Sequence, residues 1–318
     1  MAFHFSGELQ TSHSAVESIN GTIWHSTQAL RAIRPAGRKL SANTLGGVAL
    51  NLAKLRNLSI IEGILAASIL LAVTMETSVA CAQSSDNPIG LAVADTRRSE
   101  ADRERDSISK PIAVLSFFDV KPGMHVLDLL SGGGYYSEIL SYAVGQSGGV
   151  VAHTNDIYDE YHRDEIAKRY RDNRLPNVKR LSSNPPDLKL GSEVFDLVLL
   201  VMVYHDVYYE SESNPRHPKI DRNRFFAEIR RCLKPGGTLA IVDHSAMPGT
   251  GATAAQELHR IDQEFAKKDV ETAGFIFDGE SNVLRNSKDD RSMLVFDDRV
   301  RGKTDRFVFR FLKPKDRK

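Results

Sequence analysis

The sequence predicts an α/β protein with a doubly wound, mostly parallel sheet of seven strands. Three segments (125–129, 195–201 and 238–243) are runs of Val, Leu and Ile without alternation, which is typical of parallel strands buried on both faces. Helical segments separate most of the predicted strands, and this order favours right-handed crossovers. The last two strands alternate better between polar and apolar residues, so we expect an antiparallel C-terminal edge.

The elements follow one another in a regular order. A helical pattern covers 102–119 and is interrupted by Pro111, and Pro122-Gly123 then marks a turn into the first strand. The predicted strands are 125–129, 150–154, 178–182, 195–201, 238–243, 274–278 and 306–311. This layout places one domain at 102–318.

The chain before residue 102 is predicted to lie outside that domain. Residues 1–57 show little periodicity and receive no role. Residues 58–82 carry a short apolar run that ends in Ala80-Cys81-Ala82, and basic residues precede it, as in a secretory signal peptide. We therefore expect export, to the periplasm; a cytoplasmic protein, or one anchored by an uncleaved segment, is the alternative. Residues 83–101 are polar and are predicted to be a linker.

Charge and cysteine content exclude several classes of protein. The chain has 42 Lys and Arg against 41 Asp and Glu, so no electrostatic field favours a nucleic acid, and the membrane is expected to matter only for the signal segment. The two cysteines, Cys81 and Cys232, provide neither a disulfide framework nor a cysteine metal cluster. Cys232 is expected to be a small core residue.

A glycine-rich turn is the strongest functional motif. The segment 126–136 reads as a buried strand that ends near Asp128, followed by Ser131, three glycines at 132–134, and a helix. Glycines let backbone N–H groups approach a ligand closely, and Asp128 is placed to orient a cationic or amide group. In an open α/β sheet, ligands bind beyond the carboxyl ends of the strands.

Three blocks in register resemble the class I S-adenosylmethionine-dependent methyltransferases. They are the glycine turn, the acidic-led strand that begins at Phe195-Asp196, and the turn Lys234-Pro235-Gly236-Gly237 before the next strand. The likeness covers about 108–312 and implies a Rossmann-like methyltransferase fold. The C-terminal half also resembles a group of predicted exported bacterial methyltransferases, through Tyr204-His205-Asp206, Asp243-His244-Ser245, Leu258-His259-Arg260-Ile261-Asp262 and Gly302-Lys303-Thr304-Asp305-Arg306-Phe307.

The resemblance implies S-adenosylmethionine as cofactor and places particular residues around it. These are Asp128, Ser131, Gly132, Gly133, Gly134, Asn155, Asp156, Asn184 and Tyr204. Three positions depart from the family pattern. Leu130 stands where the first motif glycine is usual, and Asn155 and Asn184 stand where acidic residues usually contact the ribose and the adenine. Asn155 lacks charge assistance for a ribose hydroxyl, unless Asp156 substitutes for it.

His205, Asp206 and His244 are the candidate catalytic residues. A histidine followed by an aspartate in a pocket is typical of a general base with a neutral imidazole; the alternative is that His205 packs beside the cofactor. His259 is a candidate for binding the methyl acceptor. No metal site is expected, because His205, Asp206 and His244 do not have ligand spacing.

The leading hypothesis is methyl transfer from S-adenosylmethionine to an unidentified acceptor, with a small molecule favoured. The alternative is a non-catalytic module that binds S-adenosylmethionine or S-adenosylhomocysteine in a degraded pocket, which Leu130, Asn155 and Asn184 favour. A nicotinamide oxidoreductase is disfavoured, because the glycine turn lacks the third glycine of the dinucleotide motif.

Overall fold

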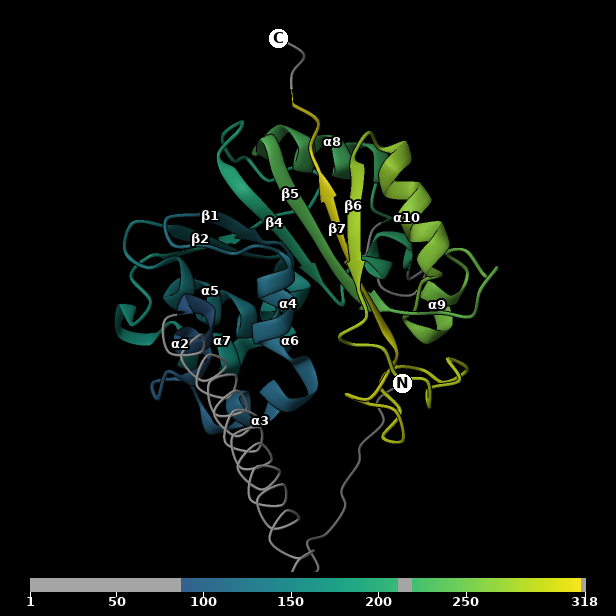
Figure 1. The fold of residues 1–318 in the computed structure, drawn as a ribbon, viewed down its shortest axis with the longest axis horizontal. Helices are drawn as coiled ribbons and strands as arrows, with labels where there is room; N and C mark the ends of the chain where they lie inside the picture. Colours follow the sequence, from purple (N-terminus) through teal and green to yellow (C-terminus); the bar gives the residue numbers. More distant parts are fainter. Residues whose placement is uncertain (1–86, 211–218, 316–318) are drawn as a thin grey trace, which may run out of the picture. The chain divides into compact units, whose positions relative to one another are not determined.

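The computed structural model describes residues 87–210 and 219–315, and these residues build one seven-stranded sheet with helices on both faces (Figure 1). The predicted extension 1–57 and the signal-like segment 58–82 lie outside the described residues. The strands are β1 His125–Asp128, β2 Gly149–Thr154, β3 Val178–Ser182, β4 Phe195–Val201, β5 Leu233–His244, β6 Ile276–Ser281 and β7 Arg306–Leu312. The helices are α2 Pro88–Ala94, α3 Glu100–Ser109, α4 Pro111–Phe117, α5 Tyr135–Val144, α6 Asp156–Tyr161, α7 Arg163–Arg169, α8 Arg222–Cys232, α9 Ala254–Leu258 and α10 Gln263–Thr272, with 3₁₀ turns η1 Arg171–Asn173 and η2 His205–Tyr208.

The sheet has the order β3-β2-β1-β4-β5-β7-β6. Strands β1 to β5 are parallel to their neighbours, and β7 runs antiparallel to both β5 and β6. The predicted fold class, including the antiparallel C-terminal edge, is confirmed. The order reverses between β1 and β4, and this switch point is where an open α/β sheet offers a crevice for ligands.

One predicted turn is part of a strand. The ladder between β4 and β5 begins at the pair Phe195–Leu233 and resumes at Leu197–Thr238, so the Lys-Pro-Gly-Gly segment bulges out of the strand. Gly236 has φ +77° there, a left-handed conformation that glycine adopts without steric cost.

The segment 83–101, predicted to be a linker, is folded over its described part. Asn87 caps α2, which buries Ile89, Ala92 and Val93 against α5. Arg98 is also buried, and its guanidinium pairs with Asp106 at 2.7 Å. Because this segment is mostly polar, its one apolar helix face was not apparent from the sequence. On a short helix, such a face needs only three or four apolar residues.

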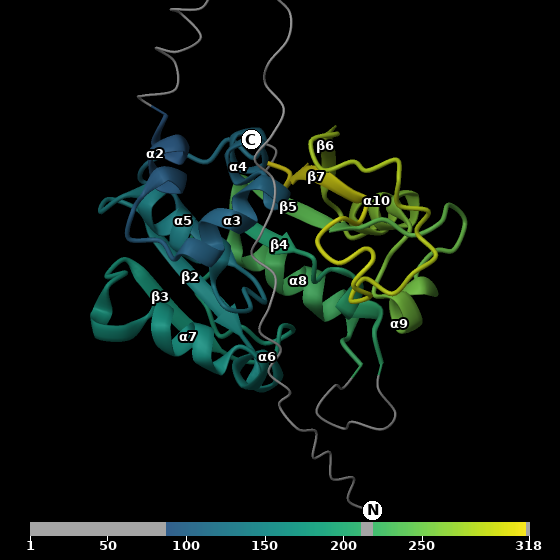
Figure 2. The same ribbon diagram turned by 90° about the horizontal axis from the view of Figure 1, so that it is seen from below.

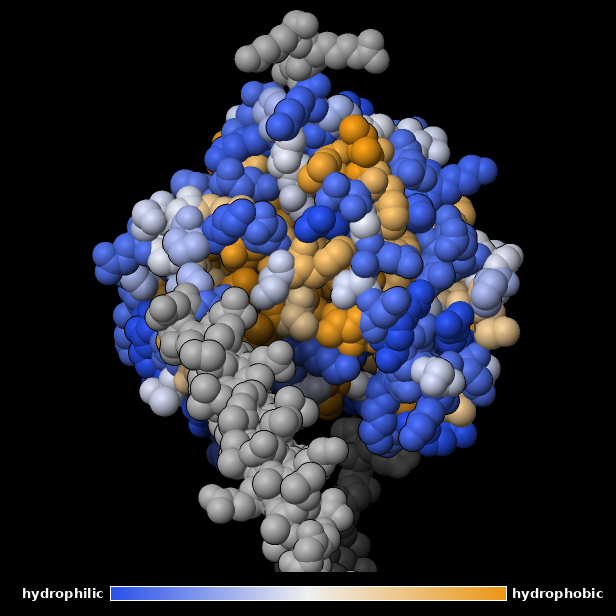
Figure 3. All heavy atoms as spheres, in the orientation of Figure 1, coloured by the Kyte–Doolittle hydropathy of each residue, from blue (hydrophilic) through white to orange (hydrophobic). Residues whose placement is uncertain are grey.

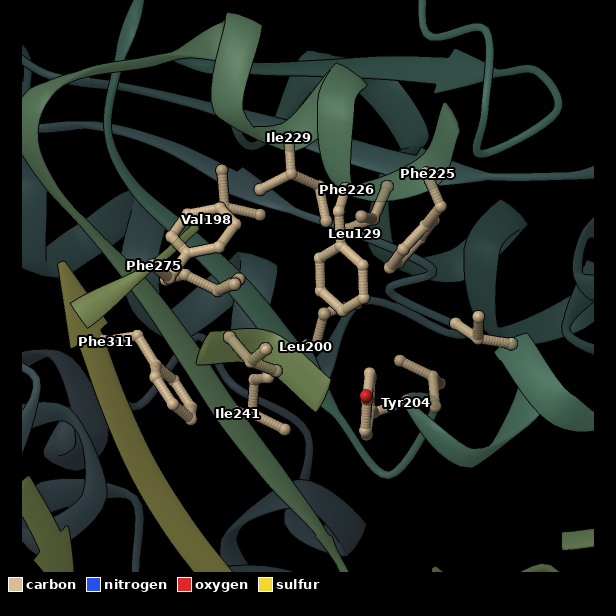
Figure 4. Packing of buried hydrophobic residues seen from close by; sticks show 14 of the residues in the cluster. Leu129, Val198, Leu200, Tyr204, Phe225, Phe226, Ile229, Ile241, Phe275 and Phe311 are labelled. Atoms are coloured by element: carbon tan, nitrogen blue, oxygen red, sulfur yellow. The ribbon is translucent and has the colours of Figure 1, made fainter. Parts of the chain in front are cut away.

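Two apolar clusters hold the layers together. Helices α2, α4 and α5 pack on one face of the sheet, and α8 and α10 pack on the other, as Figure 2 shows from below. The second cluster contains Phe225, Phe226 and Ile229 of α8, and Tyr204 lies beside them with no exposed surface (Figure 4). Cys232 is buried and free, as expected of a small core residue.

The outside of the molecule is mostly polar. In Figure 3 hydrophilic residues cover most of the face, and hydrophobic residues show along the edge formed by β6 and β7. Ile276 of β6 is exposed there. Among the described helices, none is both long enough and apolar enough to cross a membrane.

Candidate active site

A cavity of about 2060 Å³ lies at the carboxyl ends of the central strands. It is larger than a typical site for one small molecule, so two ligands can share it. The predicted site residues that line it are Asp128, Ser131, Gly132, Gly133, Asn155, Asp156, Asn184, His205, Asp206 and His244. Two predicted residues do not line it. Gly134 is buried behind the turn, and Tyr204 points into the core, where its hydroxyl donates to Asp269.

The glycine turn borders the cavity and is also held in place by contacts with other parts of the protein. Gly132 has φ +54°, and Leu130 has φ +57°. Leu130 therefore holds the conformation that the usual glycine would adopt freely, and it does so with its side chain buried. A Cβ on Gly133 would lie 1.8 Å from Glu165 Oε2, and one on Gly134 would lie 2.3 Å from Tyr170 Oη. The last two glycines thus serve close packing against α7 and the residue after it.

Arg169 of α7 anchors this turn. Its Nε donates to the carbonyl oxygen of Gly133 at 2.5 Å, and its Nη1 pairs with Asp102 of α3 at 2.8 Å and with Glu138 of α5. Glu138 is fully buried. One guanidinium therefore joins three helices to the turn that borders the cavity.

Asp128 is a buried carboxylate without a cationic partner. Ser137 Oγ donates to it at 2.6 Å, and no Lys or Arg of the described residues forms an ion pair with it. Burial raises the pKa of Asp128 to about 6, and the hydrogen bond from Ser137 opposes this rise only in part. A positively charged ligand group in the cavity would stabilise the ionised form.

Asn155 uses its amide oxygen inside the protein. Oδ1 accepts hydrogen bonds from the backbone N–H groups of Ile157 at 3.1 Å and Tyr158 at 3.0 Å, and so caps α6. Its Nδ2 remains as a donor toward a ligand, whereas a carboxylate would offer acceptors. Asp156 and Asn184 are both exposed at the cavity wall.

His153 is a residue that sequence reasoning missed. It is fully buried, accepts from the backbone N–H of Leu130 through Nδ1 at 3.4 Å, and contacts the Ser183 carbonyl oxygen through Nε2 at 3.0 Å. Burial lowers its pKa to about 4, so the ring is neutral near pH 7. It ties the glycine turn to the end of β3, where Asn184 follows. A histidine near the end of an otherwise apolar strand was the available signal.

His205 lies between two carboxylates. Its Nδ1 is 2.9 Å from Asp243 Oδ1, and its Nε2 is 3.3 Å from Asp206 Oδ1. Burial alone would lower the pKa of His205, but the charges of Asp243 and Asp206 outweigh it and raise that pKa to about 9. With no other cation bound, the ring is an imidazolium at pH 7. His205 differs in charge from the neutral imidazole expected of a general base, and its base role stays a prediction.

His244 is the neutral imidazole of this site. Its Nδ1 lies 2.7 Å from Thr304 Oγ1, and burial, reinforced by the positive charges of His205 and Arg306, keeps its pKa well below the usual value. His244 lines the cavity, so it can exchange a hydrogen bond with an acceptor molecule while remaining uncharged.

Arg306, from the motif that ends at Phe307, is a second cavity residue that the sequence analysis did not single out. It lines the cavity and is 7% exposed. Its Nη2 donates to the Ile108 carbonyl oxygen at 2.8 Å, but its buried Nε has no hydrogen-bond partner and no carboxylate of the described residues pairs with it. A buried guanidinium without a counter-charge is costly unless a ligand supplies one.

The other charged residues of the C-terminal motifs are structural. Arg260, fully buried, pairs with Asp289 at 2.8 Å and donates to the Met293 carbonyl oxygen at 2.8 Å. Asp262 caps α10, and Asp305 pairs with Arg285 at 3.0 Å. These bonds fold the segment between β6 and β7 over the cavity, where it brings Phe296 and Thr304 to the wall.

Comparisons with known proteins agree with this arrangement. Residues 127–241 match the family model described as "Methyltransferase domain". The ubiquinone/menaquinone biosynthesis C-methyltransferase UbiE of Shewanella piezotolerans is 30% identical over 126 residues, which are 39% of this chain and 44% of that protein. The corresponding protein of Haemophilus ducreyi is 28% identical over 127 residues, 40% of this chain and 43% of that one. The chain thus spans less than half the length of these curated relatives.

Solved structures are similar at a lower level. A SAM dependent methyltransferase from Aquifex aeolicus is 23% identical, with a TM-score of 0.45, over 66% of this chain and 98% of that one. An arsenic(III) S-adenosylmethionine methyltransferase from Chlamydomonas reinhardtii is 18% identical, with a TM-score of 0.38, over 62% of this chain and 65% of that one. At these values the structures say nothing about a substrate. The match to the family model covers residues 127–241, from β1 into β5, so this part of the chain resembles a methyltransferase domain.

Proposed function

We propose that the protein transfers a methyl group from S-adenosylmethionine to a small molecule bound in the same cavity. The observation that carries this proposal is a pair of buried charges in the wall of one cavity, Asp128 and Arg306, neither of which forms an ion pair within the described residues. The methionine end of the donor is zwitterionic. Its ammonium group suits Asp128, and its carboxylate suits Arg306.

The surroundings of Tyr136 support this assignment. Burial raises the pKa of Tyr136 to about 12, and the charges of Arg105, Arg306 and Asp128 all act on its hydroxyl. Arg105, Arg306 and Asp128 line the same cavity as Tyr136. Gly132 also lines the cavity, where a Cβ on it would lie 3.2 Å from the His162 ring, and the exposed Asp156 and Asn184 are available to the ribose and the adenine.

The acceptor is proposed to bind where His244 and His259 line the cavity, which we call the acceptor end. This end adjoins Arg306, because Arg306 pairs in register with His244. His244 offers a neutral imidazole there, and the rings of Tyr209, His259 and Phe296 form an aromatic wall, with 4.9 Å between the centroids of Tyr209 and His259. Methyl transfer from a sulfonium is an in-line displacement, so holding the acceptor atom in line with the methyl group dominates the rate. The role of these residues is to orient the acceptor and to exclude water from it.

A non-catalytic binding module is the second candidate, and the cap made by Asn155 favours it. With Oδ1 engaged by two backbone N–H groups, Asn155 cannot also accept strongly from a ribose hydroxyl. Such a module would bind donor and product about equally and transfer nothing.

Binding and transfer can be measured separately. The full chain should bind S-adenosylmethionine and S-adenosylhomocysteine in titration calorimetry, and should pass labelled methyl groups to a low-mass compound when incubated with cell extract and labelled cofactor. Binding of both ligands without any labelled product would indicate the non-catalytic module. If neither ligand binds, both assignments are wrong.

Export is a separate proposal, which we base on the basic, apolar and small-residue order of 58–82 and on motifs shared with exported bacterial methyltransferases. N-terminal sequencing of the protein from its native host should find a start near Gln83. Cytoplasmic protein that retains the apolar run would contradict export, without bearing on the methyl transfer.

A further inference from the structure

Three side chains at the acceptor end converge on one point. His205 Nε2 lies 3.3 Å from His259 Nδ1 and 3.3 Å from Asp206 Oδ1, and His259 Nδ1 lies 3.8 Å from the same carboxylate oxygen. Each residue offers one ligand atom, and in the part of the chain that the structure describes no other His, Cys, Asp or Glu joins them. All three residues line the cavity.

These spacings are those of a three-ligand metal site. Zinc binds imidazole nitrogen and carboxylate oxygen at about 2.0–2.2 Å, so two ligand atoms at a tetrahedral angle lie about 3.3–3.5 Å apart. The distances from His205 to His259 and to Asp206 fall in this range, and the distance between His259 and Asp206 exceeds it by a few tenths of an ångström. We propose that His205, Asp206 and His259 bind a divalent transition-metal ion, with zinc as the fitting representative.

The groups behind the ligands support this proposal. Nδ1 of His205 faces Asp243 Oδ1 at 2.9 Å, and Asp243 is fully buried and also accepts from the His205 backbone N–H at 2.8 Å. This leaves Nε2 of the ring for a metal, in the carboxylate–histidine–metal arrangement that orients many metal-binding histidines. Tyr158 Oη donates to the second oxygen of Asp206, so that Oδ1 remains for the ion.

The third ligand is fixed by packing. The His259 ring stacks on Tyr209 at 4.9 Å and lies 5.0 Å from Phe296, and its backbone has φ +52° at the end of α9. The left-handed backbone ends α9 at this residue, and the ring lies 5.3 Å from that of His205.

The donor set determines which ions fit. Two imidazoles and one carboxylate suit zinc and its transition-metal neighbours, whereas Mg²⁺ and Ca²⁺ prefer oxygen ligands throughout. Three protein ligands leave at least one coordination position open. Because the ligands line the cavity, that position is accessible to a hydroxyl, thiol or amine of the bound acceptor. This last step rests on the proposed function; the metal site itself does not.

The sequence did not indicate this site, because its third ligand comes 53 positions after Asp206 and no short spacing links them. The competing explanation is that the three side chains share protons only. Both explanations keep positive charge between Asp206 and Asp243, but they differ in zinc content.

The test uses the full chain, freed of metal by chelation and then titrated with Zn²⁺ in calorimetry, with metal content measured by mass spectrometry after dialysis. The wild type should retain one zinc ion more per chain than His259→Ala and Asp206→Asn. Both variants should bind zinc at least about tenfold more weakly at this site. His125→Ala, which removes an exposed histidine far from the cluster in the sequence, should match the wild type, and Mg²⁺ should not compete.

Cobalt gives an independent readout, since Co²⁺ in a four- or five-coordinate site absorbs visible light strongly. The wild type and His125→Ala should show this absorption, and His259→Ala should not, while circular dichroism shows the same fold in all three. Equal zinc content in the wild type and His259→Ala would overturn the proposal, as would displacement of zinc by Mg²⁺. Binding of S-adenosylmethionine to the metal-free protein is measured in parallel, so a failure of the methyl-donor assignment remains distinguishable.

Discussion

Arg169→Met is expected to lower the free energy of unfolding by about 3 kcal/mol, because it leaves a buried carboxylate without its partner. Glu138 is fully buried and Asp102 is 9% exposed, and Arg169 pairs with both. Arg174 also pairs with Glu138 and compensates for part of the loss. The variant also loses the bond to the Gly133 carbonyl oxygen, so the glycine turn should loosen and the methyl donor should bind more weakly.

Urea denaturation of the wild type and the variant at pH 7 measures the loss. Arg171→Met is a matched control, because Arg171 is exposed and its ion pair within the described residues is with the exposed Asp172. Its unfolding free energy should stay within about 0.5 kcal/mol of the wild type. Equal stability of the Arg169 and Arg171 variants would show that the buried pairs do not hold the three helices together.

The fold could be predicted from local patterns. The unalternating runs of β1, β4 and β5 and the alternating run of β7 each reflect how many faces of a strand are buried, and that information is local. Helix α2 could not be predicted in this way. Its few apolar residues become part of the core only because α5 packs against them.

The candidate site was only partly predictable, for similar reasons. Residues at strand ends, such as Asp128, Asn155 and His205, could be placed because the sheet brings strand ends together. The roles of their side chains depend on neighbours distant in the sequence. Asp243 and Asp206 together determine the charge of His205. Tyr204 points into the core, where its hydroxyl donates a hydrogen bond to Asp269.

Arg306 is another residue whose role depends on neighbours distant in the sequence. A Lys-Thr-Asp-Arg stretch before a strand reads as a solvated turn, yet its arginine is buried beside the cavity with Nε unpartnered. The neighbour that places it is β5, whose His244 pairs in register with Arg306 across an antiparallel ladder.

Asp128→Asn is expected to stabilise the protein in the absence of ligand, by up to about 3 kcal/mol at pH 7. The pKa of Asp128 is raised from 3.8 to about 6 in the folded protein, because burial disfavours the charged form. Well below pH 3.8 the carboxyl is protonated in both the folded and unfolded states and costs nothing. Between about pH 4 and 6 the unfolded carboxyl ionises while the buried one stays protonated, so the folded protein loses stability, and the loss levels off above pH 6. An asparagine keeps the bond from Ser137 without that cost.

Urea denaturation at pH 4, 5.5 and 7 measures this difference. The stability of the variant should exceed that of the wild type most at pH 7, and the difference should shrink to less than about 1 kcal/mol at pH 4. Asp119→Asn is the control, since Asp119 is exposed and asparagine tolerates its φ of +58°. A variant that is less stable than the wild type at pH 7 would show that another cation already compensates Asp128.

The same substitution should weaken binding of S-adenosylmethionine by about 10- to 100-fold at pH 7, because a hydrogen bond to a charged group contributes about 1.5–3 kcal/mol. The affinity of the wild type should rise between pH 5 and pH 7, as Asp128 ionises and can pair with the ammonium group of the donor. The affinity of Asp128→Asn should change much less over this range, while Asp119→Asn should follow the wild type. Titration calorimetry at both pH values gives these affinities directly. If the variant gains stability and keeps full affinity, the carboxylate does not face the donor, and the ammonium group must be bound by other residues of the cavity.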